Sequence, residues 1–350
     1  MSEIDLKSTS EFKKPKTENS KPETRNSKLE TTMSLPLVII NPASAGGATG
    51  EAWPGVASDL RAQFGPFERV FTEKSGDASR LAAAAVRKGT RLIIACGGDG
   101  TVSEVANGIL QTGGEAELGI IPSGTGGDFR RSLKIPAVAR EAAAILKQGC
   151  TRLIDVGRVT FVGHDELPDT RFFLGVASFG MSVEVIERVK GGGPDWIAKG
   201  PRWLSGRLSY AFSTVQTALV SPIKRVVVQI DDGVERHLTV TNLCIANARY
   251  FGGGMKIAPE AKLNDGRFDV ISIGNLGARR ILLNAPRLYT GTHLSLDQVN
   301  HVLAHKVVVR PAEKDQQLPI EVDGELLGRL PATFQIVPRA LRVRSPEKKQ

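Results

Sequence analysis

The sequence predicts a doubly wound, Rossmann-like α/β domain followed by an all-β, sandwich-like domain. The chain has 350 residues, enough for two domains of ordinary size. In residues 34–152, short apolar runs alternate with segments of helical spacing, which is typical of a parallel sheet covered by helices. In residues 153–345, many strand-like runs are separated by turn residues and few helical patterns interrupt them, which favours a sandwich or a meander.

Residues 1–33 are predicted to form a disordered tail. They carry seven Lys and Arg and six Asp and Glu, so their net charge is only +1, and they contain almost no large apolar residues. Such a segment cannot bury enough apolar surface to fold. Met33 then begins a stretch that looks like a natural protein start, so we hypothesise that translation begins there or that the tail is dispensable.

The first domain is expected to alternate four strands with four helices. Its apolar runs predict strands at Leu37–Ile40, Glu68–Thr72, Arg91–Cys96 and Leu118–Ile121. Its helical spacing predicts helices at Trp53–Phe64, Asp77–Lys88, Val102–Leu110 and Glu141–Lys147.

The second domain is expected to be built of strands. They are predicted at Arg152–Thr160, Arg171–Ala177, Arg225–Ile230, Leu238–Ala246, Arg267–Ser272, Lys306–Arg310, Ile320–Val322 and Thr333–Val337. One helical insertion is predicted around Trp203–Val220. His301 and His305 flank a strand-like run, and we interpret them as incidental and not as metal ligands.

Composition limits the classes of partner and compartment. The formal net charge is +9 and the pI is about 9.5, which favours anionic partners. Aromatic residues make up only 5% and the charge is spread out, so we expect no nucleic acid partner. Three cysteines without a CxxC spacing favour a reducing, cytoplasmic compartment. No apolar run approaches the ~18 residues that span a bilayer, so any membrane contact is expected to be peripheral.

Three glycine loops each follow a predicted strand of the first domain. They are Asn41–Gly47, Gly97–Thr101 and Pro122–Phe129. Because ligands bind at the carboxyl ends of parallel strands, the loops together predict a phosphate-binding edge, where backbone N–H groups and a helix N-terminus meet an anion. Asp99 has two readings: it handles Mg²⁺ or accepts a proton, or it is a helix N-cap.

These loops, together with motifs further along the chain, resemble the diacylglycerol kinase catalytic domain family, which includes bacterial lipid kinases and sphingosine kinases. The resemblance extends from about Leu35 to Val343. It implies a nucleotide-binding α/β domain and a β-rich lipid-binding domain, the NAD-kinase/diacylglycerol-kinase-like fold. The motifs that carry it, beyond the GGDGT of Gly97–Thr101, are an NPxSxG-like stretch from Asn41, PSGTGGDF from Pro122, Tyr250–Lys256, Pro259–Gly266 and Val322–Glu325.

The resemblance implies roles for individual residues. Gly97, Gly98, Asp99, Gly100 and Thr101 would bind the phosphates of ATP, and Asn41, Thr72 and Thr125 would line the same site. Glu325 would accept the proton of the lipid hydroxyl, although some relatives give that role to the aspartate matching Asp99. Asp265 would hold a structural Mg²⁺, helped by main-chain carbonyls near Lys262 and Arg267. One departure is Gly127, where the family often has Asn.

For two of these motifs, a turn without a catalytic or metal-binding role remains an alternative interpretation. Asp323-Gly324 is a hairpin turn signal, so Glu325 could be a plain strand residue facing solvent. Asp265-Gly266 is equally good turn chemistry.

The expected function is therefore an ATP-dependent lipid kinase acting on a lipid alcohol, diacylglycerol or sphingoid-like, at an anionic membrane surface. The alternatives are a soluble-substrate kinase of the NAD-kinase type and a non-catalytic nucleotide- or lipid-binding protein. Bacterial relatives can dimerise, so a homodimer is also open. The segment Lys190–Arg207, with Trp196 and Trp203, suits either membrane docking or packing onto the β domain.

Overall fold

The computed structural model describes residues 34–113, 115–124, 126–190, 223–313 and 315–347, without the side chains of 187–190 and 278. Residues 34–350 form one compact unit, and residues 1–33 are a separate unit. The predicted tail, the predicted helix at Trp203–Val220 and most of the Lys190–Arg207 segment lie outside the described residues.

A parallel sheet forms the first part of this unit, as the sequence predicts. Its strands are β1 (Leu37–Ile40), β2 (Glu68–Phe71), β3 (Leu92–Gly97) and β4 (Glu117–Pro122), in the order β2-β1-β3-β4. Every residue of β3 is buried, because helices cover both faces of the sheet. The strand order reverses between β1 and β3, which is the switch point where such sheets bind ligands.

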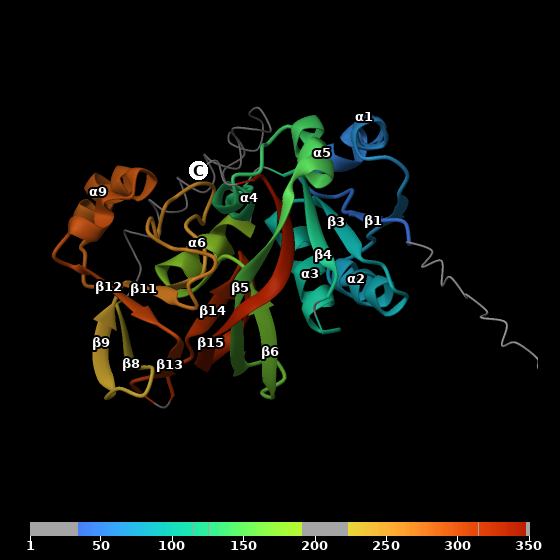
Figure 1. Ribbon diagram of the computed structural model, residues 1–350. Coiled ribbons are helices and arrows are strands. Elements are labelled where there is room, and N and C mark those ends of the chain that lie inside the picture. Colours follow the sequence, from blue (N-terminus) through green and yellow to red (C-terminus); the bar gives the residue numbers. More distant parts are fainter. Residues whose placement is uncertain (1–33, 114, 125, 191–222, 314, 348–350) are drawn as a thin grey trace, which may run out of the picture. The chain divides into compact units, whose positions relative to one another are not determined.

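Four long helices cover this sheet in two pairs. They are α1 (Ala48–Gln63), α2 (Asp77–Arg87), α3 (Asp99–Leu110) and α5 (Ala139–Gln148). Helix α1 packs beside α5, and α2 packs beside α3 on the other face (Figure 1). The predicted doubly wound α/β architecture is therefore confirmed.

Two features of this part differ from the sequence prediction. Helix α3 begins at Asp99 and not at Val102, so it starts inside the glycine motif. A short helix α4 (Asp128–Leu133) was not predicted, because its only turn and a half carries no readable hydrophobic period.

The second part is a predominantly antiparallel β structure, which confirms the predicted sandwich-like class. Its large buried side chains include Phe173, Phe179, Phe268 and Phe334. Its elements are β5 (Cys150–Val162), β6 (Pro168–Phe173), β7 (Val176–Gly180), α6 (Met181–Lys190), β8 (Lys224–Ile230), β9 (Arg236–Val240), β10 (Asn242–Ala246), β11 (Phe268–Ile273), α9 (Ala278–Thr290), the 3-10 turn η1 (Thr292–Ser295), β12 (Val299–Ala304), β13 (Lys306–Pro311), β14 (Pro319–Val322) and β15 (Glu325–Ser345).

Several elements of this part were predicted with wrong limits or missed. The run 171–177 breaks into β6 and β7, because Leu174 and Gly175 turn their N–H groups to the Asp323 carboxylate. The run 238–246 breaks at Thr241, whose N–H bonds to Ile273 O. Helix α9 was not predicted, since Pro286 within it argues against a helix.

Strand β15 joins the two parts. It pairs antiparallel with β5, β13 and β14, and its segment Arg342–Val343 pairs parallel with β4. The described strands are consequently hydrogen-bonded into one continuous sheet (Figure 1). The predicted domain boundary at residue 152 falls within β5 and stays a prediction. Among the described residues, no helix is both long and apolar enough to span a bilayer.

Candidate active site

The three glycine loops meet at the carboxyl edge of the parallel sheet. Asn41, just after β1, donates from Nδ2 to Thr101 Oγ1 at 3.1 Å. Ser123, just after β4, donates from its main-chain N to Gly97 O at 3.0 Å. The structure thus brings together loops that lie about 30 to 60 residues apart in the sequence.

Two glycines are needed for this close approach. A Cβ at Gly124 would lie 2.8 Å from the Cα of Gly98, and a Cβ at Gly126 would lie 2.7 Å from Asp99 Oδ2. Any larger residue would force the loops apart, since the first neighbour is backbone.

A small, solvent-open pocket lies between these loops. Four of its nine lining residues are glycines, whose main-chain N–H groups a ligand can approach closely, and Arg130 adds a cation, so its chemistry suits an anion. Its lining residues are Gly97, Gly98, Asp99, Val102, Ile120, Pro122, Gly124, Gly127 and Arg130.

Asp99 caps helix α4 and not its own helix. Its Oδ2 accepts the N–H of Asp128 at 3.0 Å, and its Oδ1 accepts the N–H of Phe129 at 3.1 Å. Helix α3 has Gly98 at its N-cap, without a side-chain cap. Both Asp99 oxygens are therefore engaged in holding the second glycine loop against the first.

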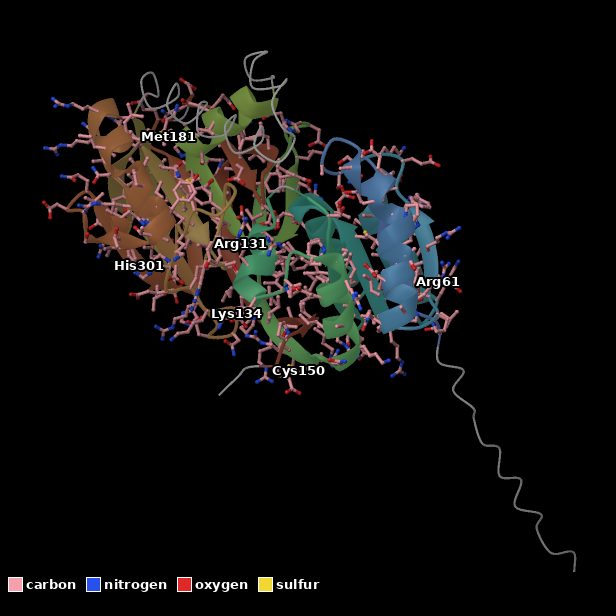
Figure 2. All side chains as sticks on the ribbon, turned by 90° about the horizontal axis from the view of Figure 1, so that it is seen from above. Arg61, Arg131, Lys134, Cys150, Met181 and His301 are labelled. Atoms are coloured by element: carbon pink, nitrogen blue, oxygen red, sulfur yellow. The ribbon has the colours of Figure 1, made fainter. Side chains whose placement is uncertain are left out.

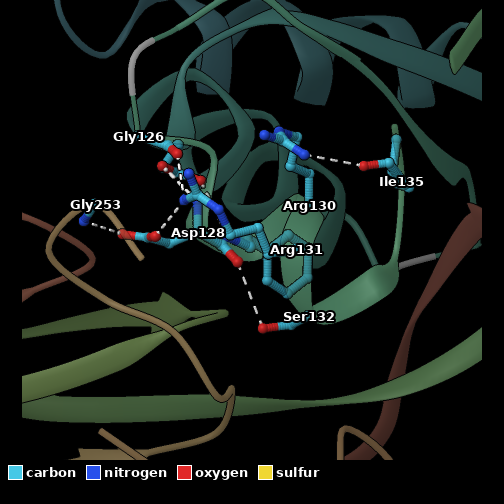
Figure 3. Close-up of polar contacts among 9 residues, drawn as sticks. Gly126, Asp128, Arg130, Arg131, Ser132, Ile135 and Gly253 are labelled. Atoms are coloured by element: carbon cyan, nitrogen blue, oxygen red, sulfur yellow. Dashed lines mark hydrogen bonds and ion pairs between the residues drawn. The ribbon is translucent and has the colours of Figure 1, made fainter. Parts of the chain in front are cut away.

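Asp128 connects the second glycine loop to the second part of the protein (Figure 3). Its Oδ2 accepts the N–H of Gly253 at 2.7 Å, and its Oδ1 accepts Arg131 Nη1 at 2.7 Å. Burial and the nearby charge of Asp99 raise the pKa of Asp128 to about 6, against the opposing effect of the Gly253 and Arg131 contacts. No separate role was predicted for Asp128, and its place in the PSGTGGDF motif was the available signal.

Gly127, the departure from the family pattern, occupies a left-handed backbone position. Its φ is 65° and its ψ is 39°, and it is the N-cap of α4. Glycine enters this region without cost, and Asn is among the residues that tolerate it best. The exchange of Asn for Gly therefore keeps the backbone that the loop requires.

Glu325 reaches the first glycine loop from the β14–β15 turn. A Cβ at Gly100 would lie 3.6 Å from Glu325 Oε1. Arg171 Nη2 lies 3.8 Å from Glu325 Oε2. The Glu325 side chain is 34% exposed, so solvent reaches it beside the loop.

Asp323, two residues earlier, ties this turn to helix α3. Its Oδ2 accepts Ser103 Oγ at 3.1 Å and Leu174 N at 2.9 Å, and its Oδ1 accepts Gly175 N at 2.8 Å. Burial raises the pKa of Asp323 to about 6, against the effect of these donors. The sequence places Asp323 in the Val322–Glu325 motif and in a hairpin turn but predicts no separate role for it, because contacts across more than 140 residues carry no local signal.

Two further residues, Thr72 and Thr125, were predicted to line the ATP site. Thr72 follows β2, where its N–H bonds to Ile40 O at 2.9 Å, so β1 separates it from β3. Thr125 lies outside the described residues.

Asp265 lies in the turn before β11, and its Oδ1 accepts the N–H of Arg267 at 3.2 Å. Burial raises the pKa of the nearby Asp269, the contact with His301 opposes it, and the charges of Asp265 and Glu260 raise it further. Among the described residues, no three His, Cys, Asp or Glu side chains form a metal-binding group. One carboxylate with main-chain carbonyls, such as those near Lys262 and Arg267, is a donor set that fits Mg²⁺ if water completes it.

His301 and His305, the histidines interpreted as incidental, do not line the pocket between the glycine loops. His301 Nε2 is 2.7 Å from Asp269 Oδ1, and His305 Nδ1 is 3.7 Å from Asp231 Oδ2.

The fold and the site define a class: a two-part protein with three glycine loops at one edge of its parallel sheet and a carboxylate brought to them from the β part. Comparison with family models gives the same division. Residues 36–159 match the diacylglycerol kinase catalytic domain, and residues 194–345 match the YegS C-terminal NAD kinase beta sandwich-like domain.

Relatives that match most of the chain carry the same family name. The diacylglycerol kinase of Mycobacterium tuberculosis (strain ATCC 25618 / H37Rv) is 31% identical over 311 residues, which are 88% of this chain and 94% of that protein. The diacylglycerol kinase of Bacillus subtilis (strain 168) is 30% identical over 280 residues, 79% of this chain and 85% of that protein. This chain therefore belongs to the diacylglycerol kinase catalytic domain family.

The fold is also shared with a solved structure. A crystal structure of a diacylglycerol kinase from Bacillus anthracis str. Sterne superposes with a TM-score of 0.64 at 21% identity, covering 90% of this chain and 98% of that one. This likeness concerns the fold.

Proposed function

We propose that this protein is an ATP-dependent lipid kinase that transfers the γ-phosphoryl group to the hydroxyl of a lipid alcohol of the diacylglycerol or sphingoid type. The position of Glu325 against the loop at Gly100 is the observation that carries the proposal. It combines a phosphate-binding loop with a carboxylate able to accept a proton, which is what phosphoryl transfer to an alcohol requires. Membership of the family supports the same reaction class.

The glycine loops would bind the phosphates of ATP. Gly97, Gly98 and Asp99 line the pocket, and the N-terminus of α3, which begins at Asp99, favours negative charge there. Asn41 holds Thr101 in place through its side-chain hydrogen bond. These groups are fixed before ATP arrives, so they stabilise charge without reorganisation in the transition state.

Glu325 would act as the general base. The hydroxyl oxygen of the lipid attacks the γ-phosphorus, the bond to the bridging oxygen breaks, ADP leaves, and Glu325 takes the hydroxyl proton. Asp99 is the weaker candidate, because both of its oxygens already accept N–H groups of α4. Its role would be to hold the two glycine loops together beside the phosphates.

Magnesium, when bound, would neutralise phosphate charge and stabilise local backbone. Asp265, with main-chain carbonyls near Lys262 and Arg267, would hold a structural ion. The reaction would take place on the cytoplasmic side of a membrane that contains the lipid.

Labelled ATP offered to the full chain with a panel of acceptors tests this function. The panel should contain diacylglycerol, a sphingoid base, an isoprenoid alcohol and NAD, each with Mg²⁺. Label in an organic-phase lipid phosphate is the expected result. Label in NADP would favour the NAD-kinase alternative, and no transfer to any acceptor would contradict the proposal.

A further inference from the structure

Helix α9 (Ala278–Thr290) has a face that is both cationic and apolar. It contains three arginines and no acidic residue. Leu283 is 70% exposed and Tyr289 is 50% exposed, which are high values for side chains of this size. At 100° per residue, Leu283 and Pro286 lie at the centre of the exposed face. The exposed cations of this helix are Arg279, Arg280 and Arg287.

The opposite face holds the helix on the protein. Leu288 packs against a buried cluster that includes Ile257 and Ile271. The cationic and apolar face is thus the outer one, and Figure 2 shows nitrogen-tipped side chains extending outward from this helix. Among the described residues, none of the ion pairs involves the three arginines, so their charge is available to a partner outside this part of the chain.

The helix is connected to the candidate active site through one loop. Leu288 O accepts the N–H of Lys256 at 2.7 Å. In the same loop, Gly253 N donates to Asp128, which bonds in turn to Asp99. Figure 1 shows this loop between α9 and α4. A surface that α9 contacts would therefore lie close to the glycine loops.

We infer that the outer face of α9 docks on a bilayer that contains anionic lipids. Guanidinium groups pair well with lipid phosphates, and leucine and tyrosine insert at the level of the headgroups. The inference rests on the proposed function, because an enzyme that acts on a membrane lipid must hold its site at the bilayer surface.

Charge argues against two other partners for the outer face of α9, a second copy of the chain and residues 191–222. A second copy related by a twofold axis would bring the arginines of α9 near their own equivalents, and like charges repel. Residues 191–222 carry three basic residues and one acidic residue, so their charge does not complement the helix either.

Binding of the full chain to vesicles tests the inference without ATP or acceptor. The vesicles are phosphatidylcholine with and without phosphatidylglycerol, and bound protein is measured by sedimentation over a salt series. We expect binding only with phosphatidylglycerol, weakening as salt rises. R279Q/R280Q should weaken it roughly 10- to 30-fold, as expected for two cations near an anionic surface. L283S should weaken it about 10-fold.

Two matched controls separate this surface from general charge and hydrophobicity. L167S removes another exposed leucine, in the β5–β6 turn, and R87Q/K88Q removes two adjacent exposed cations at the end of α2. Both should bind as the wild type does. Equal binding of the α9 variants and the wild type, or no binding of the wild type to anionic vesicles, would overturn the inference. A change of oligomeric state in L283S, with vesicle binding unchanged, would assign the face to a second copy instead.

A separate phosphorylation assay tests the proposed function. Phosphorylation of a short-chain, water-soluble diacylglycerol should be equal in the wild type and the α9 variants, because the helix does not contact the pocket. A protein that binds vesicles through α9 but phosphorylates no acceptor would defeat the proposed function alone. A protein that phosphorylates the short-chain lipid but ignores anionic vesicles would defeat the α9 surface alone.

Discussion

Glu325 and Asp99 are both carboxylates at the glycine loops, but their surroundings give them different chemistry. Asp99 accepts two main-chain N–H groups, whereas Glu325 is partly exposed and approaches the loop from another element. A carboxylate that accepts two main-chain N–H groups positions backbone, and a partly exposed carboxylate is accessible to a substrate proton. The environment, rather than residue type, distinguishes the two.

Replacing Glu325 by Gln should lower kcat for lipid phosphorylation by about 10²-fold or more, the usual contribution of a general base. The KM for ATP should change little, because the phosphate-binding loops keep their contacts. Steady-state kinetics with labelled ATP measures both. Glu313→Gln, an exposed residue paired with Arg225, is the control and should keep wild-type kcat.

The Asp323 carboxylate should make folding stability depend on pH. Its pKa is raised from 3.8 to about 6 in the folded protein, so the folded state binds the proton more tightly than the unfolded state. The contribution is fully present below about pH 4 and is lost as pH rises through about 6. This shift corresponds to at most roughly 3 kcal/mol.

Asp323→Asn removes that titration. The difference in free energy of unfolding between wild type and variant should therefore narrow from pH 5 to pH 8, measured by urea unfolding. The variant should be less stable at pH 5, since its amide places a donor against main-chain donors. A difference that stays constant over this range would contradict the raised pKa.

At the scale of elements, helix packing depends on a glycine that helix propensity disfavours. Gly108 lies within α3, and a Cβ there would be 2.3 Å from Ser79 O and 2.8 Å from Ala82 Cβ of α2. The two helices can lie this close only because the position has no side chain. Sterics therefore outweigh the preference of helices for alanine, which is only about 1 kcal/mol.

Gly108→Ala should lower the free energy of unfolding by about 1–3 kcal/mol, the usual cost of overpacking. Gly55→Ala in α1 is the matched control, because no atom lies within 4 Å of the added Cβ. It should raise stability by up to about 1 kcal/mol. Denaturant unfolding of the two variants measures both effects, and equal signs would refute the packing argument.

At the scale of the whole molecule, β15 makes the α/β part and the β part interdependent. Phe334 on this strand is fully buried and contacts Phe173 edge to face, with ring centroids 6.4 Å apart. Further along, the same strand pairs with β4 of the parallel sheet. Damage to one core should therefore reach the other through a shared strand.

Phe334→Ala should destabilise the protein by about 3–5 kcal/mol. Hydrogen exchange should become faster at the amides of both β3 and β10, because the two parts unfold together. Faster exchange confined to β10 would show that the two parts unfold independently.

The sequence by itself determined the order of the four strands and four long helices of the α/β part, because buried strands and amphipathic helices leave a local pattern of apolar residues. It also identified the three glycine loops, since parallel strands carry their carboxyl ends to one edge. It was weaker in the β part, where α6, α9 and β12 were missed and two pairs of strands, β6 with β7 and β9 with β10, were each predicted as one strand. In both pairs, long-range hydrogen bonds, and not local propensity, determine where the first strand ends and the second begins.

Only the tertiary structure decided which groups the Asp99 and Asp323 carboxylates contact. Asp99 bonds to residues 29 and 30 positions away, and Asp323 reaches Ser103 across 220 residues. Such contacts have no period or spacing that a sequence could reveal. The outer face of α9 is a similar case: its arginines and leucine were visible in the sequence, but exposure and nearness to the glycine loops arise from packing. Local patterns fix which backbone forms, and the fold fixes which side chains meet.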